Sequence, residues 1–265
     1  MPANYAMHRF GAEAMRTLPE KQQRLMQRCR RLYNAGVHGS DLFFYYRPMV
    51  ETAVGGLYRS CHAMTGRAFF TRACEALKND PSEGGTACLY GLLANYCLNR
   101  ELSELYREQT LPRTELEVEL DRYLLSLDGK LPPKTQDISA SLKLTRGECV
   151  TVALFFPPAT AGNVLTAHRE MVFWVRGLSA KNRWFATALL HLTGEDFRRQ
   201  RMPDHANHRC IHLDKPMLAC YERALESYPR MAAELKEFLE QGTPLGEDFD
   251  RPFHGKGSSD EIGKS

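Results

Sequence analysis

The segment from 86 to 107 carries polar side chains at a spacing that could line an interior site. Asn95, Asn99 and Ser103 stand at positions i, i+4 and i+8 of an otherwise apolar stretch, so they share one face of a helix. Asparagine is unfavourable inside a helix because its amide competes for the backbone's hydrogen bonds. Two asparagines at this spacing indicate either a polar interior or a face turned to solvent, and the spacing alone leaves both interpretations open.

The following segment repeats this spacing with charged residues. Arg113 and Glu117 also stand four residues apart, the spacing at which two side chains meet on consecutive turns of a helix. On an exposed helix such a pair contributes only roughly a few tenths of a kcal/mol. Spacing alone therefore favours an ordinary surface ion pair.

A cluster of metal-binding residue types lies further along the chain, between prolines that indicate a loop. Its members are His205, His208, Cys210 and His212. Their spacing matches no standard zinc pattern, so we expect an unligated or adventitiously occupied loop. Cys61 directly precedes His62, and adjacent side chains rarely turn toward each other, which argues against a thiol nucleophile there. The sequence contains no phosphate-binding glycine loop and no Gly-x-Ser-x-Gly motif.

Helical periodicity dominates the elements that must position these residues, and alternating strand patterns are almost absent. Residues 36–48 are expected to form a loop with a dense aromatic cluster, and residues 145–156 fit either a helix or a buried strand. Pro229 should kink or split the last helix. The expected helices are 9–17, 20–33, 52–64, 67–78, 86–107, 113–126, 161–177, 180–193 and 217–241.

No repeat and no inter-domain linker interrupts this pattern, which predicts a single all-α, multi-helix bundle domain over residues 1–241. Gly242 follows the last helical stripe, as a glycine that ends a helix does. From Gly246 onward the sequence is rich in Gly, Ser and charge without periodicity. We therefore expect residues 242–265 to form a disordered tail.

The composition excludes several classes of protein. Of the 265 residues 43% are hydrophobic, enough for a sizeable core, and the net charge of +3 indicates neither nucleic-acid binding nor a membrane surface. The N-terminus does not resemble a signal peptide, and no apolar run approaches the roughly 18 residues that span a bilayer. The eight cysteines include no Cys-x-x-Cys and are expected to be reduced and mostly buried. We expect a cytoplasmic protein; the sequence does not indicate its oligomeric state.

Four segments between residues 4 and 125 resemble the zinc-dependent phospholipase C family, in its signal-less bacterial branch. They are Asn-Tyr-Ala-Met-His-Arg-Phe-Gly at 4–11, Gly-Val-His-Gly-Ser-Asp at 36–41, Cys-His-Ala-Met at 61–64, and Glu-Leu-Glu through Asp-Arg-Tyr-Leu-Leu at 115–125. These segments follow the family's order and intervals, whereas the remainder fits its helical pattern only loosely. The resemblance implies an all-α bundle holding three zinc ions, which polarise a phosphodiester and activate a bound water.

Only part of the family's metal-ligand set is retained at matching positions. The retained ligands are Asp41, His62 and Glu117. The other ligand positions carry Met7, Asn95, Asn99, Ser103 and Arg113, with His8 beside Met7 as a substitute if the register is one residue off. Amides and hydroxyls are weak zinc ligands, and a guanidinium has no lone pair to donate. The resemblance thus implies zinc for the family, but no zinc or at most one for this chain.

Three hypotheses follow from these residues. The first is a catalytically impaired or inactive phospholipase C relative that binds a phosphodiester or phospholipid-like ligand or a partner in a polar interior. The second is a phosphodiester hydrolase with one zinc on Asp41, His62 and Glu117, aided by His8. The third is an unrelated helical interaction protein. Under the first, we expect Arg113 to occupy the space of a lost zinc and to neutralise both acids.

Overall fold

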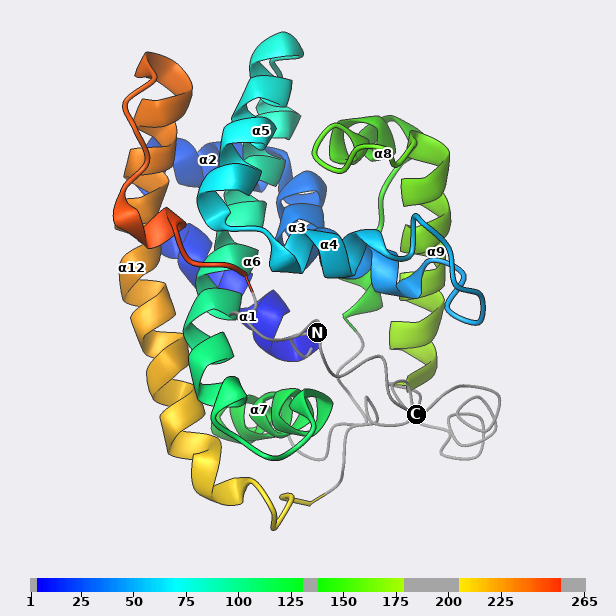
Figure 1. Ribbon diagram of the computed structural model, residues 1–265, viewed down its shortest axis with the longest axis vertical. Helices are drawn as coiled ribbons and strands as arrows, with labels where there is room; N and C mark the ends of the chain where they lie inside the picture. Colours follow the sequence, from blue (N-terminus) through cyan, green and yellow to red (C-terminus); the bar gives the residue numbers. More distant parts are fainter. Residues whose placement is uncertain (1–3, 131–137, 179–204, 254–265) are drawn as a thin grey trace.

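The computed structural model describes residues 4–130, 138–178 and 205–253 as a bundle of α-helices (Figure 1). These residues contain no β-strand, only an isolated bridge between Thr65 and Pro252. The predicted all-α fold is therefore confirmed. The α-helices are α1 (Asn4–Thr17), α2 (Glu20–Arg28), α3 (Arg30–His38), α4 (Leu57–Ala63), α5 (Gly66–Asn79), α6 (Glu83–Arg107), α7 (Arg113–Leu127), α8 (Arg146–Ala153), α9 (Ala161–Leu178) and α12 (Asp214–Gln241). The 3-10 helices are η1 (Gly39–Tyr45), η3 (Ser139–Leu142), η4 (Ile211–Leu213) and η5 (Glu247–Phe249).

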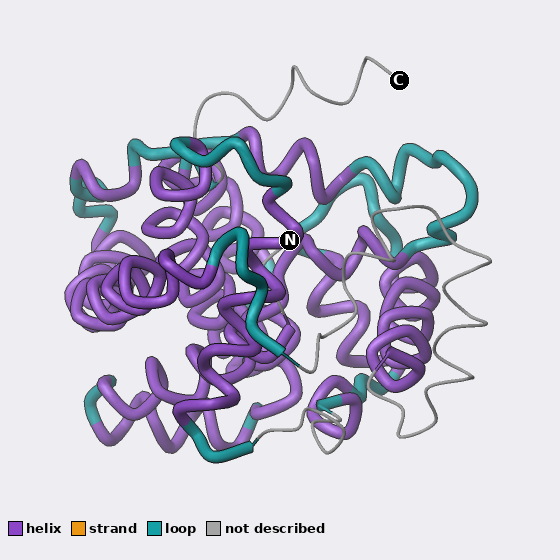
Figure 2. Tube along the Cα trace, turned by 90° about the horizontal axis from the view of Figure 1, so that it is seen from below, coloured by secondary structure: helices purple, strands orange, loops and turns teal. Residues whose placement is uncertain are grey.

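Helix α6 lies at the centre of the bundle. The side chain of Ser82 accepts a hydrogen bond from the Gly85 amide at 2.9 Å and so begins the helix. All of residues 87–100 are buried, so the helix turns no side to solvent over this stretch. Helices α3 and α12 make the most extensive contacts with α6, and α7 lies against α1 and α12 near one end of the bundle. Helices α8 and α9 pack together beside η1, and loops join the described helices throughout (Figure 2).

Two glycines let α3 and α6 touch backbone to backbone. A Cβ atom added at Gly36 would lie 2.1 Å from the Cys88 carbonyl oxygen, and one added at Gly91 would lie 2.1 Å from the Tyr33 carbonyl oxygen. Only glycine permits this approach, because the atoms that it meets belong to the backbone and cannot rotate away. The contact holds the C-terminal end of α3, at His38, against the middle of α6.

Two predicted boundaries near the candidate site are wrong. The loop expected at residues 36–48 is helical over most of its length, because α3 continues to His38 and η1 follows it. The helix expected over 52–64 begins only at Leu57. The aromatic cluster in this segment is part of the core, with Phe43 and Tyr45 fully buried.

Two other predictions concern the second half of the chain. The ambiguous segment 145–156 contains helix α8, which begins with a capping box formed by Thr145 and Glu148. Pro229 does not split the last helix, because α12 continues through it. The helix expected at 180–193 lies outside the described residues.

The tail predicted to be disordered is ordered in its first part. Gly242 ends α12 in the left-handed conformation, with φ of +76°, as expected for a terminating glycine. Residues 243–253 then run back over the bundle and bury three apolar side chains. These side chains are Leu245, Phe249 and Phe253. The prediction failed because they stand among Gly, Asp and Pro, where no helical or strand period reveals them; residues 254–265 lie outside the described part.

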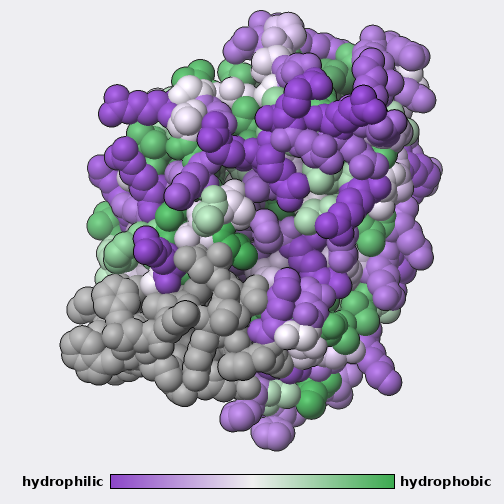
Figure 3. All heavy atoms as spheres, turned by 180° about the vertical axis from the view of Figure 1, so that it is seen from behind, coloured by the Kyte–Doolittle hydropathy of each residue, from purple (hydrophilic) through white to green (hydrophobic). Residues whose placement is uncertain are grey.

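Three features of the described residues bear on the expectations drawn from composition: long apolar helices, the cysteines and the surface. No helix in the described residues is long and apolar enough to cross a membrane. All eight cysteines are free, and all except Cys29 are buried, as predicted. On the face drawn in Figure 3, hydrophobic side chains are scattered in small groups among hydrophilic ones.

We expect Gly91→Ala to lower the free energy of unfolding by about 3 kcal/mol, the upper end of the usual cost of overpacking, because the added methyl group must separate two backbones. Chemical denaturation followed by circular dichroism measures this change. Gly147→Ala is the matched control, since a Cβ there meets nothing within 4 Å and lies in helix α8. This control should be neutral or up to about 1 kcal/mol more stable. Equal effects of the two substitutions would contradict the proposed close contact.

Candidate functional site

The polar stripe of α6 lies in the interior. The residues Asn95, Asn99 and Ser103 are 1%, 0% and 3% exposed, so the interpretation that they face solvent is wrong. Helix α6 is buried on every side over this stretch, which leaves no solvated face for them. Each polar atom must therefore find a partner inside the protein.

The stripe is connected by hydrogen bonds that run from α6 to α3. The Asn99 side-chain nitrogen donates to the Asn95 side-chain oxygen and to the Asn95 carbonyl, both at 3.1 Å. The Asn95 side-chain nitrogen donates to the Val37 carbonyl at 3.0 Å, near the end of α3. The Ser103 hydroxyl lies 2.5 Å from the Asn99 carbonyl and 2.9 Å from the Phe253 carbonyl, and can donate to either.

Arg113 reaches this stripe from α7. Its Nε lies 2.7 Å from Glu117 Oε1, and one terminal nitrogen donates to the Asn99 side-chain oxygen at 3.3 Å. The guanidinium also covers the face of the Tyr106 ring, 5.2 Å from its centroid. Glu117 is only 3% exposed, so the prediction of an ordinary surface pair is wrong. Burial raises the pKa of Glu117, although Arg113 opposes this shift.

Asp41, the other acid that Arg113 was expected to neutralise, is paired with His62 instead. Asp41, in η1, lies 2.9 Å from His62 Nε2, in α4, and both side chains are buried. Burial opposes ionisation of Asp41, but the adjacent His62 outweighs it and holds the pKa of Asp41 below its ordinary value. Burial also lowers the pKa of His62, against the attraction of Asp41. At neutral pH the pair is therefore a carboxylate beside a neutral imidazole. Of the two acids Asp41 and Glu117, it is Glu117 that Arg113 contacts.

The first motif supplies Met7, and not His8, to the stripe. Met7 is 1% exposed, and its sulfur lies 3.9 Å from the Asn95 side-chain nitrogen. His8 is half-buried, and its Nδ1 lies 3.4 Å from the Ser141 hydroxyl instead. Burial lowers the pKa of His8, as do the nearby charges of Arg30 and Lys130. Of the two residues, Met7 is therefore the one that lies beside Asn95.

Two further buried titratable residues near the stripe, Asp121 and His38, were not singled out as site residues by the sequence analysis. Asp121 accepts hydrogen bonds from the backbone amides of Tyr5 at 3.0 Å and Ala6 at 2.5 Å, at the start of α1, and burial raises its pKa to about 8. Asp121 extends the i, i+4 spacing of Arg113 and Glu117 by one more turn, a signal that could have revealed it.

His38, the last residue of α3, has no such signal. Its Nε2 is buried without a hydrogen-bond partner in the described part of the chain, and burial lowers its pKa to about 3. The charges of His8 and Asp41 act on it as well, so it belongs to the same interior group of titratable side chains. A single histidine inside a segment predicted to be a loop carries no pattern that sets it apart.

The donors present at this site do not fit a zinc cluster. No three His, Cys, Asp or Glu side chains among the described residues lie close enough together to hold a metal ion, the set of Asp41, His62 and Glu117 included. The amides of Asn95 and Asn99 are already engaged within the protein, and a cation from Arg113 lies beside them.

The histidine-rich loop shows no alternative metal site in this part of the chain. Its three histidines are exposed and its cysteine is buried, so they do not face a common centre. The residues are His205, His208, Cys210 and His212.

No protein-family model matches the chain, and neither a curated protein nor a solved structure matches it. The likeness to the zinc-dependent phospholipases C rests on its four sequence segments alone.

Replacing Arg113 by Met should lower the free energy of unfolding by about 2–4 kcal/mol at pH 7.5, because a buried carboxylate loses its partner. The pKa of Glu117 is already raised in the folded state and rises further in the variant. The loss of stability caused by Arg113→Met should therefore shrink as the pH falls to about 4.5. Near that pH Glu117 takes up a proton in the folded and in the unfolded protein, so no buried charge is left without a partner. Urea denaturation at the two pH values measures the difference.

The matched control is Arg24→Met, which breaks an exposed pair with Glu20 at the same i, i+4 spacing. This control should change stability by less than about 0.5 kcal/mol. The double variant Arg113→Met/Glu117→Gln should recover most of the lost stability. A loss at Arg113 that matched the control, or that did not depend on pH, would contradict a buried pair.

Acidification should destabilise the protein through His38. Its pKa is about 3 in the folded state, against about 6.5 in an unfolded chain, so the unfolded state binds more protons between these values. Stability should therefore fall as the pH drops from 6.5, and His38→Gln should reduce the slope by on the order of 1 kcal/mol per pH unit. Urea unfolding at pH 7, 6 and 5 measures the slope. The same substitution at the exposed His205 should leave the slope unchanged, and an unchanged slope in His38→Gln would rule out this source of acid sensitivity.

Proposed function

We propose that the chain is a non-catalytic relative of the zinc-dependent phospholipases C that acts by binding rather than by hydrolysis. In this proposal a hydrogen-bonded polar core takes the place of the metal cluster. The observation that carries it is the position of Arg113, whose guanidinium is held by Glu117 and Asn99 on the helix face aligned with the family's metal ligands. A fixed cation there compensates the buried carboxylate and repels a divalent ion.

The bonding of the stripe supports the same conclusion. A zinc ion at this face would have to break the bonds of Asn95 to Val37 and of Asn99 to Asn95. In return it would gain amide oxygens, which are poor zinc ligands compared with imidazole or carboxylate. The exchange is unfavourable on both counts.

The alternative is a hydrolase with a single zinc. The contact between Asp41 and His62 favours it, because two of the three retained donors already lie together. The third donor, Glu117, is engaged by Arg113, and a catalytic zinc requires three protein ligands beside its water. Two available ligands make this the weaker candidate.

The resemblance implies a phosphodiester or phospholipid-like molecule as the ligand class. Arg113 is the group of this site that such an anion can reach, since a quarter of its side chain is exposed. A guanidinium has five N–H donors, so Arg113 keeps donors for a phosphate oxygen beyond those that bond Glu117 and Asn99. The proposed role is therefore anion binding at the outer edge of a polar core.

Purified full-length protein, expressed with added zinc, should carry less than about 0.1 zinc per chain and should not hydrolyse bis(p-nitrophenyl) phosphate above the buffer rate. Elemental analysis measures the bound zinc, and the absorbance of released nitrophenolate measures the hydrolysis. About one tightly bound zinc together with zinc-dependent hydrolysis that is lost in Asp41→Asn would overturn the proposal and support the single-zinc hydrolase.

A variant with the ligand positions restored serves as the positive control. It combines the substitutions Met7→His, Asn95→His, Asn99→Asp, Ser103→His and Arg113→His. This variant should gain bound zinc, because it returns imidazole and carboxylate donors to the face of α6. Failure of a folded restored variant to bind zinc would count against the family register.

A further inference from the structure

The C-terminal segment of residues 243–253, here called the strap, returns from the end of α12 and closes over the candidate site. It leaves α12 at Gly242, runs back along that helix, and then crosses toward α6 and α4 (Figure 1). Apart from the single turn of η5 it has no helical hydrogen bonds of its own. The position of the strap therefore depends on its contacts with other elements.

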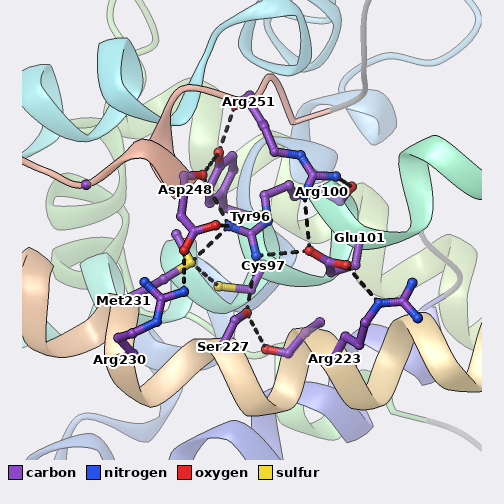
Figure 4. A network of polar contacts seen from close by, with 12 residues as sticks. Tyr96, Cys97, Arg100, Glu101, Arg223, Ser227, Arg230, Met231, Asp248 and Arg251 are labelled. Carbon is purple, nitrogen blue, oxygen red and sulfur yellow. Dashed lines mark hydrogen bonds and ion pairs between the residues drawn. The ribbon is translucent and has the colours of Figure 1, made fainter.

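Arginines from three helices bind the strap through its acids and carbonyls, and Figure 4 shows two of them, Arg100 and Arg230, at Asp248. Arg67 of α5 donates to the Leu245 carbonyl at 2.7 Å and pairs with Asp250 at 2.5 Å. Arg100 of α6 lies 3.0 Å from an Asp248 carboxylate oxygen, and Arg230 of α12 pairs with the same carboxylate. The acids of the strap thus lie against arginines of the bundle, and its one arginine, Arg251, lies against Glu101 and Glu104 of α6. Such charge complementarity is of the kind found between a peptide and its receptor.

Backbone and aromatic contacts complete the docking. The Gly66 amide, which has no partner within α5, donates to the Arg251 carbonyl at 3.0 Å, and the Phe253 amide donates to the Met64 carbonyl at 3.2 Å. The Tyr96 hydroxyl lies 2.8 Å from the Arg251 carbonyl, and the Tyr96 ring contacts the ring of Phe249 at 6.0 Å. Main-chain pairing with aromatic anchors is a recurring mode of peptide recognition.

The end of the strap covers the polar interior. The Phe253 carbonyl lies 2.9 Å from the Ser103 hydroxyl, and the Phe253 ring stacks on His62 with centroids 6.3 Å apart. His62 in turn contacts Asp41. Withdrawal of the strap would therefore uncover both the Ser103 end of the stripe and the Asp41–His62 pair.

We propose that the groove between α4, α5, α6 and α12 is a peptide-docking site whose occupant is the strap, and that the strap is an exchangeable lid over the polar interior. It is attached to the bundle at Gly242, and two of its ion pairs, with Arg67 and Arg230, are partly exposed and weakened by salt. The helices pack on one another without it, through the α3–α6 and α6–α12 contacts. The lid therefore opens as a unit while the bundle stays folded. This inference goes beyond the proposed function and does not depend on it.

Amide hydrogen exchange of the full-length protein tests the opening, because the Gly66 amide is bonded to the strap and the Leu93 amide lies in the core of α6. We expect Gly66 to exchange at least about 100-fold faster than Leu93 after correction for intrinsic rates. Sodium chloride at about 0.5 M should speed Gly66 alone, because it screens the exposed pairs. Equal exchange at the two amides would overturn the lid, since the strap would then open only on global unfolding.

A peptide added in trans tests the docking site. In the full-length variant Phe249→Ser, which loses one anchor, the exchange of Gly66 should rise about tenfold, and a synthetic peptide of residues 243–253 should restore protection. The same peptide carrying Phe249→Ser and Phe253→Ser should not restore it. The exposed-site variant Val150→Ser controls for the substitution by serine itself and should leave the exchange of Gly66 unchanged. A folded variant whose protection the wild-type peptide does not restore would overturn the docking site, and the wild-type exchange experiment decides the case if the variant does not fold.

Discussion

The backbone contact between α3 and α6 determines where the interior groups of this protein lie. With Gly36 and Gly91 against opposing carbonyls, α3 cannot slide or rotate without separating from α6. The contact brings the Val37 carbonyl to Asn95 and sets the direction in which η1 continues, with Gly39 at φ +55° beside the same side chain. Because η1 carries Asp41, the position of the carboxylate next to His62 follows from a packing contact that contains no charge.

Charged groups occupy two faces of α7, and both are buried. One face carries Arg113, Glu117 and Asp121 toward α6 and α1. On the other face Arg122 lies 2.6 Å from Glu119 and 3.0 Å from Asp214, at the start of α12. Each carboxylate has a guanidinium or backbone amides within reach, as a buried charge requires. Burial and the neighbouring Glu119 raise the pKa of Asp214 to about 6, so this carboxyl group keeps its proton to a higher pH than an exposed aspartate does.

The sequence predicts the elements of this fold better than their surroundings. Leu18 before Pro19 ends α1, and Gly242 ends α12, because these residues restrict the backbone locally. The spacing of Asn95 and Asn99 reveals a shared face. Because the other faces of this helix are apolar, the pattern does not indicate whether the shared face is turned to the interior or to solvent. For α7 the charged pattern resembles that of a surface helix, and only tertiary contacts show that Glu117 is buried. The strap could not be predicted, because its bonds come from arginines far away in the sequence.

The side-chain amides of Asn95 and Asn99 form a series of hydrogen bonds that runs in one direction. Arg113 donates to Asn99, Asn99 donates to Asn95, and Asn95 donates to the Val37 carbonyl. Since a guanidinium can only donate, it fixes the orientation of the first amide, and each amide then fixes the next. The dipoles of the two amides therefore point the same way and polarise one another, which strengthens the series of hydrogen bonds from α7 to α3. Because the guanidinium can only donate and the Val37 carbonyl at the other end can only accept, this is the one orientation of the two amides in which each of these bonds can form.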